Sequence, residues 1–270
     1  MKRSKEYRMW GRASLTGRWK TAVLALLALA GVVVVWSVVI GLIIGFPMFN
    51  MAPEQLSDEE LILFFFKIMS RAFAALGLSL VVMIFLTPAM RGRTLLHIRF
   101  IRKEAAPFGV LFDPYRRLLG KSIGLYFLRQ LYLMLWAMIP FAGFFIVMVK
   151  SFSYALSDYI LLDNPGMTVN DAITKSRQMM DGKKWKLFCL TLSFIGWFIL
   201  VGLTLGILAL YVVPYMNAAR AAFYEDIKAD HAKINPGNLD DGELYRRYKE
   251  YYGNSPDNNG FNEPNDPVFS

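Results

Sequence analysis

Two charged residues inside apolar segments are the side chains with the clearest chemical potential. Arg129 lies in an apolar stretch that begins at Ser122, about 10 Å along a helix from its start. Asp158 lies near the end of the next apolar stretch, at a comparable depth. Because charges inside a membrane tend to pair, we predict an intramembrane ion pair between Arg129 and Asp158. In the alternative, Arg129 extends to the inner lipid headgroups and Asp158 contacts water.

Patterns typical of enzymes and metalloproteins are missing from the sequence. It contains no defensible Ser/His/Asp order, no glycine-rich phosphate loop and no H-E-x-x-H motif. Cys189 is the single cysteine, which excludes an internal disulfide and a thiolate metal cluster. His97 and His231 are too far apart in sequence to suggest a shared metal site. We therefore predict a protein without catalytic activity, metal or cofactor.

The elements that must position the two charges are apolar helices. Of the 270 residues, 55% are hydrophobic and 19% are charged, and long uncharged runs such as 23–49 alternate with short charged loops. A helix needs roughly 20 apolar residues to cross a bilayer, whereas a soluble core needs no such runs. The sequence therefore predicts an all-α, polytopic transmembrane helix bundle.

We predict about six spans arranged as three hairpins. Residues 122–162 and 186–226 are each twice the length of one crossing, and each contains a natural turn, at 139–143 and at 204–206. The second span is expected to end near Met90. One long helix in each double-length region would give four spans instead. The predicted spans are 21–49, 61–90, 122–138, 141–162 and two within 186–226.

Charge distribution predicts the orientation of the spans. Residues 1–20 contain seven Lys or Arg, residues 50–60 contain four acids and no base, and residues 91–121 contain eight Lys or Arg. Basic loops remain on the cytoplasmic side, so both termini are predicted to be cytoplasmic. The same distribution argues against nucleic-acid binding, because the bases flank spans. The expected domains are a basic N-terminus (1–20), a transmembrane bundle (21–227) and a polar, largely disordered tail (228–270).

Two segments outside the spans are predicted to be interfacial amphipathic helices. Residues 91–106 place apolar residues on one face and bases on the other, as a connector on an anionic inner leaflet does. Residues 168–181 begin with a capping pattern, Thr168 followed by Asp171, and continue with a semi-apolar stripe. The predicted helix over 168–181 either packs beneath the bundle or docks a membrane-protein partner.

A glycine followed by a base recurs before each predicted hairpin. Gly17, Gly120 and Gly182 occupy these positions. A left-handed glycine would close a surface helix, and the base would bind the inner headgroups. The pattern predicts three copies of one hairpin unit, unless the similarity between such short segments is accidental.

Ten residues in the second half of the chain form a recognisable signature: Asp163, Asn164, Pro165, Gly182, Trp185, Gly196, Trp197, Gly206, Pro214 and Tyr215. With this signature the chain resembles a bacterial integral-membrane family, catalogued as domain of unknown function 975 and found mostly in Gram-positive bacteria. The resemblance is specific over 139–227 and looser over 10–138. It departs from the family pattern where Phe141 and Ala142 separate Pro140 from Gly143, and at Leu208, where the family prefers glycine. It implies a bacterial membrane location and a helical fold, and no activity.

Three classes of function are compatible with these features. The missing catalytic pattern favours a non-enzymatic scaffold, assembly factor or regulator in the bacterial cytoplasmic membrane, contacting anionic lipids and a possible membrane-protein partner. A small-solute or lipid transporter or channel is the alternative, although few polar residues fall in mid-span. A lipid-modifying membrane enzyme would need an acid, base or metal set that the sequence lacks.

Overall fold

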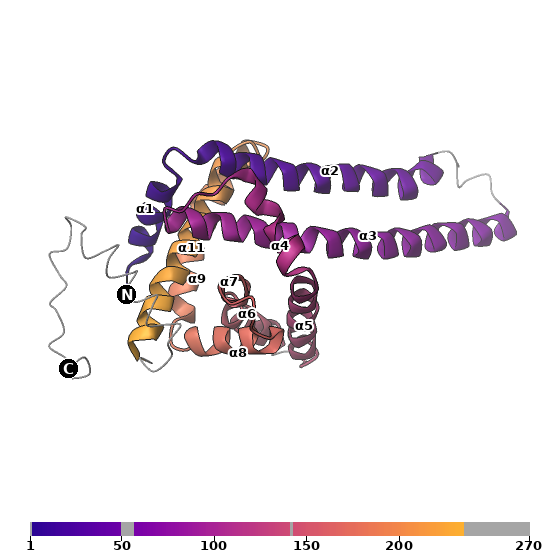
Figure 1. The fold of residues 1–270 in the computed structure, drawn as a ribbon. Coiled ribbons are helices and arrows are strands. Elements are labelled where there is room, and N and C mark those ends of the chain that lie inside the picture. The colour runs from indigo at the N-terminus through magenta and orange to yellow at the C-terminus, as the bar shows by residue number, and fades with distance from the viewer. Residues whose placement is uncertain (1, 50–56, 141–142, 235–270) are drawn as a thin grey trace, which may run out of the picture. The chain divides into compact units, whose positions relative to one another are not determined.

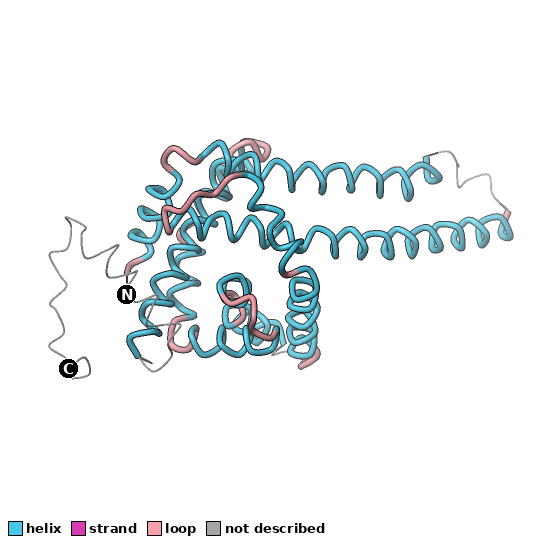
Figure 2. Tube along the Cα trace, in the orientation of Figure 1, coloured by secondary structure: helices cyan, strands magenta, loops and turns pink. Residues whose placement is uncertain are grey.

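The computed structural model describes residues 2–49, 57–140 and 143–234, and this part of the chain is helical without strands (Figure 2). The chain forms two compact units, one of residues 2–223 and one that begins at Tyr224. The helices are α1 (Ser4–Leu15), α2 (Trp19–Phe49), α3 (Asp58–Ile101), the 3₁₀ helix η2 (Phe108–Phe112), α4 (Asp113–Arg117), α5 (Leu119–Ala137), α6 (Gly143–Ser153), α7 (Ser157–Asp163), α8 (Val169–Met179), α9 (Lys184–Leu192), α10 (Ile195–Leu203) and α11 (Ala209–Ile234).

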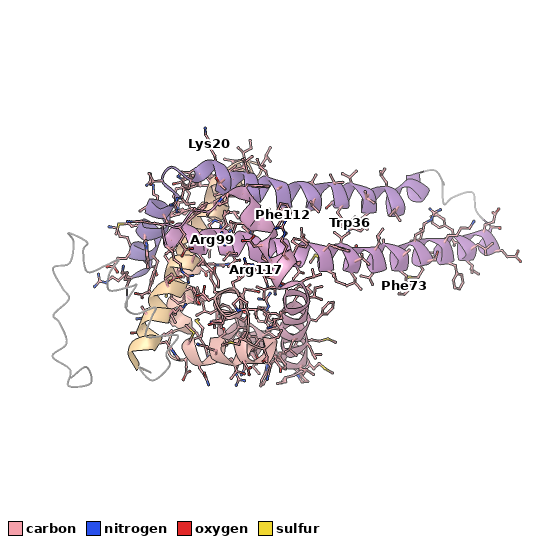
Figure 3. All side chains as sticks on the ribbon, viewed as in Figure 1. Lys20, Trp36, Phe73, Arg99, Phe112 and Arg117 are labelled. Carbon is pink, nitrogen blue, oxygen red and sulfur yellow. The ribbon has the colours of Figure 1, made fainter. Side chains whose placement is uncertain are left out.

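Helices α2 and α3 lie side by side along much of their length (Figure 1). The indole Nε1 of Trp36 on α2 donates to the hydroxyl of Ser79 on α3 at 3.3 Å. Figure 3 shows Phe73 on the side of α3 that faces away from α2, and its side chain is 66% exposed. Phe66, about two helical turns before Phe73 on the same face, is 70% exposed. Aromatic residues this exposed are unusual on a surface that contacts only water.

The helix that contains the second predicted span does not end near Met90, where that span was expected to end. Helix α3 continues through Pro88 to Ile101 and has 44 residues, about 66 Å at 1.5 Å per residue. Residues 91–101 are therefore not a separate surface connector. Their apolar side chains, such as Leu96 and Phe100, are buried, and this part of the chain packs with η2, α5 and α7. Burial of these side chains accounts for a helix that persists past a proline.

Four described segments are long and apolar enough to cross a membrane: Trp19–Ile43, Glu59–Ile101, Gly143–Asp163 and Lys184–Leu203. The helices also end near both predicted turns, because α5 ends at Ala137 and α10 ends at Leu203. Helices α5 and α11, which would provide the remaining two crossings, are not among these four segments. Six spans in three hairpins, and the domain boundaries drawn from them, therefore stay predictions.

Helix α8 confirms the amphipathic helix predicted at 168–181. The Thr168 hydroxyl caps it by accepting from the N–H of Asp171 at 3.2 Å. Its inner face includes Ala172, Ile173 and Ser176, all buried. The Ser176 hydroxyl donates to the carbonyl of Ser153 at 2.7 Å and accepts from the N–H of Leu156 at 3.2 Å. These two bonds tie α8 to the turn between α6 and α7.

The glycine pattern holds at two of its three positions. Gly17 and Gly182 have φ angles of 75° and 66°, in the left-handed region that glycine adopts without a steric penalty. Gly120 instead lies inside α5, which begins at Leu119. The break before α5 falls on Leu118 (φ −135°, ψ 18°), a conformation that needs no glycine. The predicted glycine cap at position 120 is therefore wrong.

Candidate functional site

The two residues of the predicted ion pair lie together. Arg129 on α5 approaches Asp158 on α7, with Nη1 and Oδ2 2.7 Å apart. A third residue that the sequence analysis placed elsewhere joins them: Nε of Arg91 on α3 lies 2.9 Å from Oδ1 of Asp158. Each oxygen of the Asp158 carboxylate thus contacts one guanidinium, and three helices meet at this cluster.

Arg91 was missed because the sequence placed it at the start of a surface connector, one residue after the expected end of the second span. In the structure the helix continues, and only 4% of the Arg91 side chain is exposed. Asp158 and Arg129 retain 21% and 27% exposure. A buried guanidinium is costly unless it is paired, so Asp158 is the residue that makes burial of Arg91 tolerable.

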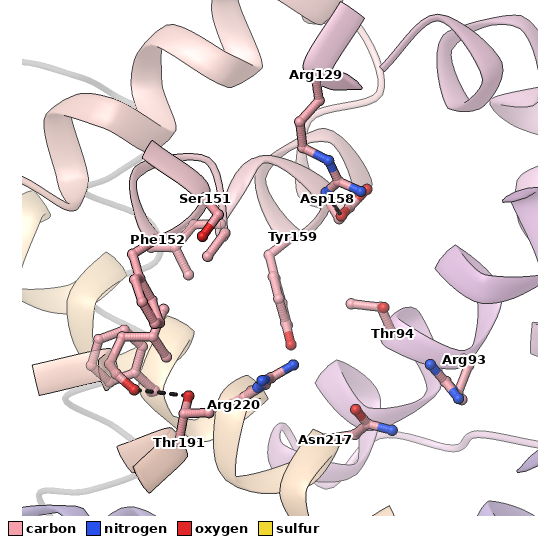
Figure 4. Close-up of a pocket in the computed structure, with 14 residues that line it drawn as sticks. Arg93, Thr94, Arg129, Ser151, Phe152, Asp158, Tyr159, Thr191, Asn217 and Arg220 are labelled. Carbon is pink, nitrogen blue, oxygen red and sulfur yellow. Dashed lines mark hydrogen bonds and ion pairs between the residues drawn. The ribbon is translucent and has the colours of Figure 1, made fainter. Parts of the chain in front are cut away.

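Beside the ion-pair cluster lies a cavity of about 430 Å³ (Figure 4). Segments from α3, α5, α6, α7, α9 and α11 surround it, all within the unit of residues 2–223. Figure 4 shows Tyr159 extending from α7 toward the guanidinium of Arg220. The lining residues are Arg93, Thr94, Arg129, Ser151, Phe152, Ala155, Leu156, Asp158, Tyr159, Leu187, Thr191, Asn217, Arg220 and Phe223.

The cavity lining is strongly basic. Arg93, Arg129 and Arg220 contribute positive charges, and Asp158 is the only acid among the described residues of the lining. The Asp158 carboxylate is already occupied by Arg91 and Arg129. Among the described residues, Arg93 and Arg220 have no carboxylate within ion-pair distance. Two half-buried guanidinium groups therefore face the cavity without an anionic counterpart from the described part of the chain.

Two polar nitrogen atoms near the cavity also lack partners. Nδ2 of Asn217, which lines the cavity, and Nη1 of Arg91 are shielded from solvent and form no hydrogen bond with described residues. A shielded donor without an acceptor costs about 1–3 kcal/mol. The Asn217 amide is therefore a donor available to a molecule that enters the cavity.

Three family-signature residues lie at the end of α7, and two of them contact earlier parts of the chain. The carboxylate of Asp163 pairs with Arg102, the residue that follows α3, at 2.7 Å. Nδ2 of Asn164 donates to the carbonyl of Ile160 at 3.2 Å. The carbonyl of Pro165 accepts from Nζ of Lys121 at 2.6 Å. These contacts hold the end of α7 in place and involve no cavity residue.

The other signature residues lie at turns and aromatic contacts. Gly182 and Gly206 are left-handed, with φ angles of 66° and 89°. Trp185 stacks on Phe188 with ring centroids 5.0 Å apart. Gly196 and Trp197 lie on α10, and Pro214 lies inside α11. Tyr215 packs edge-on against Phe194 at 5.2 Å. None of the ten signature residues lines the cavity.

The sequence analysis also missed Arg93, Arg220 and Asn217 as site residues. A signal for Arg220 was present, because it is the only charge between residues 187 and 222. No comparable signal marked Arg93, which lies among several bases. Within the described residues, no group of three or more His, Cys, Asp and Glu could hold a metal ion.

Comparison with known proteins bears on the second half of the chain. No curated protein and no solved structure matches the sequence. A family model described as "Protein of unknown function (DUF975)" matches residues 145–231. This range includes Asp158, Asn217 and Arg220, whereas Arg93 and Arg129 precede it. The predicted resemblance is therefore confirmed over residues 145–231, which match the model of this family of unknown function.

Proposed function

We propose that this chain is a multi-pass protein of the bacterial cytoplasmic membrane that acts without catalysis, as a scaffold, assembly factor or regulator. The observation that carries the proposal is the exposed apolar surface of α2 and α3, which includes Phe66 and Phe73. Exposing such side chains to water would forfeit about 1.5–3 kcal/mol each, and a bilayer removes that cost.

The proposed topology has six spans with both termini in the cytoplasm. It is supported by the basic loops that flank the apolar segments and by the acidic stretch at 54–60. Labelling of introduced cysteines in intact cells tests it, in a background in which Cys189 is replaced by Ser. We expect Arg177→Cys on α8 to resist an impermeant maleimide and Glu59→Cys to react with it, since both positions are exposed in the structure. Labelling of both positions from outside would refute this topology.

The absence of catalysis is supported by the state of the single cavity carboxylate. A general base needs a free acceptor atom, and both oxygens of Asp158 contact guanidinium groups. Asp158 is therefore better suited to holding Arg91 and Arg129 than to transferring protons.

A small-solute or lipid transporter is the second candidate, and the cavity of about 430 Å³ is the observation that favours it. Its volume falls within the usual range of small-molecule sites, about 300–1,000 Å³. Purified full-length chain in liposomes distinguishes the two candidates. The scaffold proposal predicts no flux of phosphate or fluorescent lipid above that of protein-free liposomes. Protein-dependent flux would refute the scaffold proposal and support the transporter candidate.

A further inference from the structure

We propose that the arginine-lined cavity binds a phosphate group, with Arg93 and Arg220 as its principal ligands. The group belongs either to an anionic lipid or to a soluble phosphate compound, and the chemistry of recognition is the same in both cases. The planar guanidinium fork donates two parallel hydrogen bonds to an oxyanion, and such charge-assisted bonds are roughly twice as strong as neutral ones.

Charge balance is the first argument for an anion. The three arginines and one aspartate of the lining leave a formal charge of +2. Removing unpaired charges from water is unfavourable, so they require a counter-charge. Arg129 already has one in Asp158, at 2.7 Å. Arg93 and Arg220 do not within the described chain, so the unbalanced charge is located on these two residues.

The arrangement of donors is the second argument. Arg93 comes from α3 and Arg220 from α11, so the two guanidinium groups approach the cavity from different helices (Figure 4). Asn217 lies one helical turn before Arg220, and its unpartnered Nδ2 is a third donor. The Arg91–Asp158–Arg129 cluster closes the other side and acts as a positioning element. A phosphate group offers enough oxygen atoms to engage donors from several directions.

Size is the third argument. A cavity of about 430 Å³ exceeds the space that one inorganic ion fills. Apolar lining residues such as Phe152, Leu187 and Phe223 surround the remainder. A phosphate group attached to an organic moiety satisfies both the basic and the apolar parts of the lining.

Binding measurements on the full-length chain test the inference with two probes. In one arm, phosphatidylglycerol is added to phosphatidylcholine nanodiscs and bound lipid is counted by native mass spectrometry. In the other arm, inorganic phosphate is titrated against the chain in neutral detergent, with the unfolding midpoint as the readout. The test variant is Arg93→Gln with Arg220→Gln. The matched control, Arg116→Gln with Arg117→Gln, removes the same charge from exposed positions outside the cavity.

We expect the test variant to bind at least about tenfold more weakly than the wild type, because each lost charge-assisted hydrogen bond contributes about that factor. The control is expected to bind within about twofold of the wild type, since exposed charges contribute little. Binding in the lipid arm alone assigns a lipid headgroup, and binding in the phosphate arm assigns a soluble phosphate compound. Failure of the wild type to bind either probe, or equal losses in both variants, overturns the inference.

A conservative variant keeps the test decisive if the double substitution prevents folding. Arg220→Lys retains the charge but loses the two-bond fork, so we expect a several-fold weaker affinity with an unchanged helix content. Affinity equal to that of the wild type would contradict the assigned role of Arg220. The phosphate arm does not depend on the proposed topology. Cysteine labelling can therefore refute the topology while leaving the phosphate site standing, and absence of binding refutes only the site.

Discussion

Replacing Asp158 with Asn tests whether one carboxylate compensates two guanidinium groups. The substitution preserves the size of the side chain and removes its charge, so Arg91 and Arg129 both lose their ion-pair partner. Removing one member of a buried ion pair costs about 3–5 kcal/mol. Arg91 is almost completely buried, whereas Arg129 is partly hydrated. We therefore expect the free energy of unfolding to fall by about 3 kcal/mol, the lower end of that range.

The assay is reversible unfolding of the purified chain in mixed micelles, in buffer without phosphate so that no added anion replaces the lost charge. Arg129→Gln should cost less than Asp158→Asn, because Asp158 keeps its contact with Arg91. Asp113→Asn is the control, since Asp113 and Arg99 form a pair at 3.1 Å with 37% and 29% of their side chains exposed. Such a pair contributes about 0–1 kcal/mol. Equal losses for the Asp113 and Asp158 variants would refute the reasoning.

Four glycine substitutions, two of them controls, test the packing and the turns. A Cβ at Gly92 would lie 1.9 Å from the carbonyl oxygen of Leu111, so Gly92→Ala should lower the free energy of unfolding by at least about 1–3 kcal/mol. Gly77→Ala meets no atom within 4 Å and should be neutral or stabilising by up to about 1 kcal/mol; a loss at both positions would contradict the close approach. Gly182→Ala should cost about 1–2 kcal/mol because its φ is 66°. Gly120→Ala should cost nothing measurable in the same unfolding assay, and a similar loss there would restore the threefold glycine pattern.

Local patterns in the sequence were sufficient to predict several of the helices and the breaks between them. The capping residue Thr168 and the apolar spacing of residues 168–181 predicted α8, because a helix end and a helical face depend on residues within a few positions of one another. The breaks after Ala137 and Leu203 followed from glycine, proline and the length of a membrane crossing. These features depend on short-range geometry, which the order of residues records directly.

The end of α3 and the site could not be predicted in the same way. The sequence predicted a span ending near Met90 and a separate surface helix over 91–106, yet α3 is continuous to Ile101 and packs with η2, α5 and α7. That extension brings Arg91 to Asp158 and places Arg93 in the cavity lining. Whether an arginine faces lipid headgroups, a carboxylate or a cavity depends on helices distant in sequence, and local spacing carries no record of them.

The sequence by itself determined the helical class, the apolar segments, the family of residues 145–231 and the candidate pair Arg129 and Asp158. Only the tertiary structure decided that Arg91 shares this carboxylate and that Arg93 and Arg220 face one cavity. The physical reason is that apolar periodicity selects a local conformation, whereas charge compensation depends on which atoms lie within a few ångströms of each other after the helices pack.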